Sequence, residues 1–187
     1  MNGFFRNIWL AARLAQFQGD AVERYPDDDR AFWRSFIGLF LILALDFLIS
    51  DLSISAYGDP EAGLSRAPTA SAWLAVGWLL NLAIAAEFAR LMKRADRWPR
   101  FVVAHNWTSL LQSVVLATVI VVLASIEATS KTYDFWLVVL GFWSLMFDWY
   151  VVKVALKIDG PPAALLIAIM LAASLLVKAL ALDFMVV

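Results

Sequence analysis

The sequence predicts an all-α membrane protein: a polytopic bundle of five transmembrane helices with an N-terminal amphipathic helix at the membrane interface. Three observations support this prediction. Of the 187 residues, 63% are hydrophobic and 17% are charged. A soluble domain usually has about 45–50% apolar and about 25% charged residues. Long apolar runs use most of the chain, and the basic residues between them fall on alternate sides.

Residues 1–30 are predicted to form an amphipathic cytoplasmic segment, with a helix over residues 3–18. Polar and apolar side chains occupy opposite sides of this helix: Arg6, Arg13 and Gln16 on one, and Phe5, Ile8, Trp9, Ala12 and Ala15 largely on the other. Such a helix can lie flat in the membrane interface. It can equally pack on the inner face of the protein itself, and the sequence favours neither alternative.

Residues 31–187 are predicted to form the transmembrane domain. A hydrocarbon core about 30 Å thick needs about 20 apolar helical residues to cross it. Five segments meet this requirement, at about residues 32–50, 70–91, 101–124, 134–156 and 163–184. All six prolines lie outside these spans. Backbone hydrogen bonds can therefore close within each helix, as the bilayer requires.

The distribution of Lys and Arg predicts the orientation. Residues 1–34, 90–100 and 153–162 hold twelve basic residues, whereas the two opposite loops and the C-terminal tail hold three. Because short basic loops stay in the cytoplasm, the N-terminus is predicted to lie inside and the C-terminus outside.

Several classes of function are disfavoured by composition. The chain has no cysteine, which excludes disulfides, thiolate chemistry and Cys-based metal sites. A net charge of −1 argues against nucleic-acid binding. With a single His and no phosphate-binding loop or nucleophile elbow, we expect no enzyme activity, no cofactor and no metal.

Polar residues at membrane depth are costly, so each one needs an explanation. At the start of the third span, His105, Ser109 and Gln112 share one face of the predicted helix, and Asn106 lies beside them. One interpretation is a small polar site, such as a proton relay, an ion path or a substrate pocket. The other is structural, because such side chains commonly form hydrogen bonds between membrane helices.

Two carboxylates are predicted to reach the same cytoplasmic third of the bundle. These are Glu87 on the second span and Asp148 on the fourth. We expect them to join His105 and Asn106 in one polar layer, or to pair with nearby basic residues, Arg90 or Arg94 for Glu87 and Lys153 for Asp148. Asp46 is expected to lie alone toward the outer end of the first span.

The fifth span carries a stripe of small residues at Ala164, Ala168 and Ala172. Such a stripe permits close approach of another helix. The stripe could serve packing within one protomer, a homo-oligomer or a membrane-protein partner, and the sequence does not separate these uses.

The segment Arg100-Phe-Val-Val-Ala-His-Asn-Trp-Thr-Ser-Leu-Leu-Gln112 opens the third span after a basic loop. Together with the span layout over residues 30–185, it resembles bacterial members of the YIP1-like membrane protein family. The Asp-Leu-Tyr-Gly-Pro motif of eukaryotic relatives is absent. The resemblance implies a helical bundle in the bacterial cytoplasmic (inner) membrane that acts through partners or lipids, and it transfers no catalytic residue.

The sequence therefore predicts a non-enzymatic membrane interaction protein, either an accessory or assembly subunit of a membrane complex or a lipid-organising scaffold. Its expected partners are membrane lipids and a membrane protein or a second copy of the chain. The alternative is a small ion, proton or solute transporter or channel that uses the polar layer.

Overall fold

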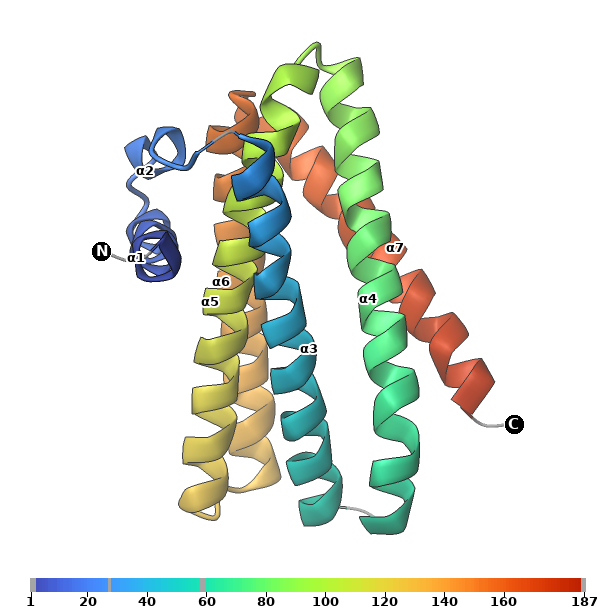
Figure 1. Ribbon diagram of the computed structural model, residues 1–187. Helices are drawn as coiled ribbons and strands as arrows, with labels where there is room; N and C mark the ends of the chain where they lie inside the picture. The colour runs from blue at the N-terminus through green and yellow to red at the C-terminus, as the bar shows by residue number, and fades with distance from the viewer. Residues whose placement is uncertain (1–2, 27, 58–59, 186–187) are drawn as a thin grey trace.

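The computed structural model describes residues 3–26, 28–57 and 60–185, with side chains described for 3–26, 28–47, 69 and 71–181 (Figure 1). In chain order the elements are α1 (Gly3–Ala15), α2 (Asp20–Glu23), α3 (Asp29–Tyr57), α4 (Pro60–Leu91), the 3-10 helix η1 (Ala95–Arg97), α5 (Trp98–Ser125), α6 (Ser130–Leu156) and α7 (Gly160–Met185). These ranges contain no strand. The all-α prediction is confirmed.

Four helical stretches in the described chain are long and apolar enough to cross a membrane: Ser71–Leu91, Ala95–Ser125, Ser130–Leu156 and Gly160–Ala181. They contain or closely match the second to fifth predicted spans. The first predicted span lies inside α3, and its crossing of the membrane stays a prediction. Helix α4 begins before the predicted span and runs through Pro68.

The five long helices form a closed ring. Helix α5 contacts α3 and α6, α3 contacts α4, α4 contacts α7, and α7 returns to α6. Figure 1 shows α3, α5 and α6 nearly parallel, and α7 tilted away from them toward the C-terminus. The α4–α5 and α6–α7 turns and the short helix α2 lie at the same end, which we call the basic end.

Four helices end on a residue in the left-handed conformation that is not glycine. These residues are Phe17 after α1, Lys93 after α4, Glu127 after α5 and Lys157 after α6. At each end, the next amide donates to a carbonyl five residues back, for example Arg94 N to Ala89 O at 2.7 Å. This bond satisfies a carbonyl that the helix leaves free.

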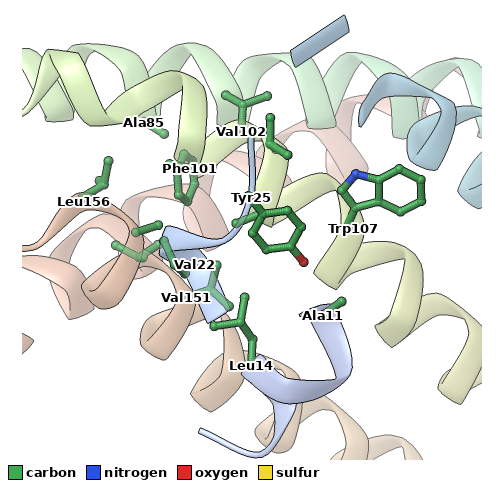
Figure 2. Close-up of a cluster of buried hydrophobic side chains, with 14 of the residues drawn as sticks. Ala11, Leu14, Val22, Tyr25, Ala85, Phe101, Val102, Trp107, Val151 and Leu156 are labelled. Atoms are coloured by element: carbon green, nitrogen blue, oxygen red, sulfur yellow. The ribbon is translucent and has the colours of Figure 1, made fainter. Parts of the chain in front are cut away.

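The first half of α5 is the centre of the core. Residues 101–110 are all buried, because α1, α3 and α6 surround this part of the helix. Figure 2 shows Leu14 and Val22 of the N-terminal segment beside Val151 of α6, with Tyr25 between them and Phe101 of α5; all belong to one buried cluster. An unbroken buried stretch of this kind is expected for a helix that has neighbours on every side.

Helices α1 and α2 form a hairpin that packs on the bundle. Leu10, Ala11 and Leu14 are buried against it, and an interfacial position of the helix stays a prediction. The packed side differs from the predicted apolar side and leaves Phe5 and Trp9 exposed. In Figure 1, α1 is seen end-on beside the upright helices, so its axis crosses theirs.

Candidate functional site

A cavity of about 350 Å³ lies inside the ring, and all five long helices contribute to its lining. Its polar side chains come from α3, α4, α5, α6 and α7: Asp46, Asn81, His105, Ser109, Gln112, Ser113, Asp148 and Ser174. The predicted shared face of His105, Ser109 and Gln112 thus turns toward one space. Apolar side chains, including Trp78, form the rest of the wall.

Asp148 is the carboxylate that the structure places against the third span. Gln112 Nε2 donates to Asp148 Oδ1 at 2.9 Å, which links α5 to α6 inside the ring. The pairing with Lys153 that the sequence allowed is not formed. Instead the Lys153 ammonium lies over the Trp149 ring, 5.4 Å from its centroid.

Asn81 links α4 to α7 on the other side of the cavity. Its Nδ2 donates to Ser174 Oγ at 2.9 Å. Its Oδ1 is buried and has no hydrogen-bond partner among the residues that the structure describes. A buried amide oxygen without a donor costs about 1–3 kcal/mol, so this atom is one acceptor that a ligand in the cavity could satisfy.

His105 is held by ring contacts. It is 8% exposed and lies between Trp78, 5.0 Å away between centroids, and Phe101, 5.3 Å away and nearly parallel. Within the described part of the chain, its ring nitrogens form no hydrogen bond. The stacking fixes the ring plane and leaves the nitrogens available at the cavity wall.

Asn106 does not reach the cavity, although it is the next residue along α5. Trp78 Nε1 donates to its Oδ1 at 3.2 Å, and its Nδ2 donates to Ser35 Oγ at 2.8 Å. Ser35 Oγ in turn donates to Phe32 O at 2.7 Å. Asn106 is fully buried, and its hydrogen bonds join α3, α4 and α5.

Of the two alternatives for Glu87, the structure shows the pairing with Arg90 and not the polar layer. Glu87 is exposed and pairs with Arg90 at 2.7 Å on the outside of α4. It follows Asn81 by six residues, which turns it about 240° around the helix from the side chain that faces the cavity. Its neighbours Ala85 and Ala89 face inward instead.

The prediction that Asp46 lies alone was wrong. Asp46 of α3 lines the same cavity as Asp148, Ser113 and Leu116. Ser174 was missed by the sequence reasoning. A signal was available, because Ser174 is the one hydroxyl in the predicted span 163–184.

The alanine stripe of α7 faces outward. Ala164, Ala168 and Ala172 are exposed, whereas Leu166 and Met170 face the bundle. The inward face of α7 is thus made by larger side chains next to the stripe, and the small residues are not used in packing within the described protomer.

A second polar cluster, which the sequence reasoning missed, fastens the hairpin at the basic end. The carboxylate of Glu23 on α2 accepts from Arg97 and Arg100, and Lys157 Nζ lies 3.1 Å from it. Arg97 Nε also donates to Ala155 O at 3.2 Å. These three basic residues come from η1, α5 and the end of α6, so one carboxylate joins three parts of the bundle.

The electrostatics of Glu23 follow from this arrangement. The hydrogen bond from Arg97, the contact with Lys157 and the charges of Arg97 and Arg100 lower the pKa of Glu23 from 4.5 to about 2, although partial burial opposes the shift. The carboxylate is therefore charged at any physiological pH.

In the part of the chain that the structure describes, the fold is all-α, and four helices able to cross a membrane surround a polar cavity together with α3. The chain matches no protein-family model, no curated protein and no solved structure. The YIP1-like resemblance therefore stays a prediction from the sequence.

Proposed function

We propose that the chain is a five-span membrane protein that acts without catalysis, as an accessory or assembly subunit of a membrane complex or as a lipid-organising scaffold. The basic end and the N-terminus lie in the cytoplasm, and the membrane is a bacterial inner membrane. Helix α3 is the first span. Its 29 residues extend about 43 Å, longer than a hydrocarbon core of about 30 Å.

The observation that carries this proposal is the way in which the α1–α2 hairpin is held. Apolar burial and the Glu23 cluster hold it across the bundle. Its outer side presents Phe5, 63% exposed, and Trp9, 47% exposed, with Arg13 over the Trp9 ring. Aromatic and basic side chains together suit the membrane interface, so the hairpin provides a rigid surface for lipids or a partner.

The outward alanine stripe supports an association within the membrane plane. Without a hydrophobic driving force between helices in lipid, close packing at small residues is a main source of attraction. A second copy or a partner helix could approach α7 along Ala164, Ala168 and Ala172, because nothing in the described protomer covers them.

Replacing Ala168 with leucine is expected to abolish this association. The protein would be cross-linked in native membranes and purified in mild detergent, and its mass and bound partners would be measured. Gly141→Leu on α6 is the matched control, because a side chain there meets nothing within 4 Å. Wild type and control should associate. A wild type that is monomeric and without a stable partner would refute the proposal.

A second candidate is a small ion, proton or solute transporter or channel, and the composition of the cavity favours it. Among the described residues, two carboxylates, Asp46 and Asp148, and one imidazole line the space, and no Lys or Arg does. Such a lining suits a cation or a proton. The unpartnered Oδ1 of Asn81 adds an acceptor.

In proteoliposomes, Asp148→Asn is expected to reduce proton or monovalent cation flux by about tenfold or more, because a buried carboxylate at membrane depth is rarely replaceable. The amide keeps a polar group beside Gln112 and preserves the volume. Glu87→Gln, outside the cavity, should leave the flux unchanged. Equal flux in wild type and Asp148→Asn would rule out this use of the cavity.

A further inference from the structure

A groove of about 390 Å³ separates the N-terminal hairpin from the start of α3. Arg6 of α1 and Arg30 and Arg34 of α3 line it, and Trp107 of α5 contributes to its wall. Three guanidinium groups from two helices therefore share one concave surface at the basic end. This groove is separate from the polar cavity, with which it has no lining residue in common.

The positive charge of the groove is not balanced within the described chain. Arg6, Arg30 and Arg34 form no hydrogen bond or ion pair with any described residue, in contrast to Arg97, which Glu23 neutralises. Among the described residues that line the groove, one is a carboxylate, that of Asp28, and its Oδ1 already accepts from the amide of Ala31 at 2.6 Å. In this described lining, three guanidinium groups therefore face one carboxylate.

Two lining residues also have buried polar atoms without partners. The indole Nε1 of Trp107 is one, in a side chain that is 2% exposed, and Oδ1 of Asn7 is the other. A buried indole N–H usually finds an acceptor. An oxygen-rich group that enters the groove could supply it, while the arginines hold its charge.

The surface that continues from the groove is apolar. Along α3, the spacing from Arg30 and Arg34 to Ile37 and Leu41 keeps these side chains on one face, and both apolar residues are exposed. Phe4, also exposed, lies beside the groove on α1. A ligand that is anionic at one end and apolar along its length fits this surface, in which basic side chains are followed by apolar ones.

We propose that the groove binds the phosphate of an anionic phospholipid from the inner leaflet, with an acyl chain along Ile37 and Leu41. The three arginines hold the phosphate through charge-assisted hydrogen bonds. Basic pockets between membrane helices on the cytoplasmic side are established sites for anionic headgroups. The inference deepens the lipid-organising role and rests on it for the placement of the basic end at the inner leaflet.

The test is native mass spectrometry of the full chain, released from detergent after incubation with phosphatidylglycerol or phosphatidylcholine at equal concentration. We expect the wild type to retain the anionic lipid preferentially. The variant R6Q/R30Q/R34Q should reduce this retention by about tenfold or more, because each basic contact with an anionic lipid contributes. The charge-matched control K93Q/R94Q/K153Q changes exposed residues outside the groove and should bind as the wild type does.

One further variant and one competition experiment complete the test. Trp107→Phe keeps an aromatic side chain, smaller than the indole, and removes the N–H donor; it should weaken retention by a few fold, about the effect of one hydrogen bond. Inorganic phosphate in excess should not displace the lipid. Equal retention of both lipids, full retention by R6Q/R30Q/R34Q, or displacement by inorganic phosphate would each overturn the proposal. None of these outcomes alters the association state that Ala168→Leu tests. A failure of lipid binding can therefore be distinguished from a failure of the proposed association.

Discussion

Replacing Glu23 with alanine is expected to detach the α1–α2 hairpin from the bundle while the membrane helices stay folded. The change removes the Glu23 carboxylate from Arg97 and Arg100, which are 14% and 15% exposed. Removing one partner of a buried pair costs about 3–5 kcal/mol. Glu23 is 42% exposed, so solvent screening reduces the expected loss to about 2 kcal/mol.

Hydrogen exchange of α1 and α2 amides measures this loss, because local opening of a structural unit has its own free energy. A loss of about 2 kcal/mol corresponds to about 30-fold faster exchange. Glu87→Ala is the matched control: it removes an exposed carboxylate paired with Arg90 and should change stability by less than about 0.5 kcal/mol. Hairpin exchange that is equal in the two variants would show that Glu23 does not fasten the hairpin.

The same cluster gives the hairpin a defined acid sensitivity. Because the folded-state pKa of Glu23 is lowered from 4.5 to about 2, its stabilising effect is fully present above pH 4.5. It is lost progressively as the pH falls toward 2, where the folded protein also takes up the proton. A carbon-13 NMR titration of the Glu23 carboxyl should give the low midpoint in wild type.

Replacing Gly38 with leucine is expected to destabilise the whole bundle. A Cβ at Gly38 would lie 3.0 Å from the backbone O of Asn106, so α3 and α5 are in close backbone contact there. A larger side chain must push the helices apart, which costs about 1–3 kcal/mol. The hydrogen bond from Asn106 Nδ2 to Ser35 Oγ would be lost as well, which costs about a further 0.6 kcal/mol of stability, the average for such bonds.

Thermal unfolding in detergent or lipid nanodiscs measures this effect. Gly141→Leu is again the control, because nothing lies within 4 Å of a Cβ there, and it should be neutral or slightly stabilising since glycine weakens a helix interior. If Gly38→Leu unfolds at the same temperature as Gly141→Leu, the close contact between α3 and α5 does not contribute to stability.

The helices were predictable because the bilayer acts on each segment separately. Length and apolar composition determine whether a segment can cross, and the long helices contain the predicted spans. Their exact ends were harder to predict. Lys93, Glu127 and Lys157 end helices in the left-handed conformation, where the usual glycine signal is missing from the sequence.

The polar site was predictable in part. The shared face of His105, Ser109 and Gln112 follows from helix periodicity, and Asp148 of α6 was expected at the same depth; all four line the cavity. The sequence left two alternatives open for Glu87 and wrongly expected Asp46 to lie alone, because both positions depend on the rotation of α4 and α3 within the ring. Depth in the membrane, which the charge pattern predicts, does not determine that rotation.

The sequence by itself determined that the chain forms long apolar helices, since hydropathy is a property of each segment on its own. The tertiary structure decided which side chains meet. The order of helices in the ring brings Asp46, Asn81 and Asp148 to one cavity, and the fold of the basic end brings Glu23 to Arg97. Such pairings depend on contacts between segments far apart in the chain, such as that of Gly38 with Asn106, which no local pattern encodes.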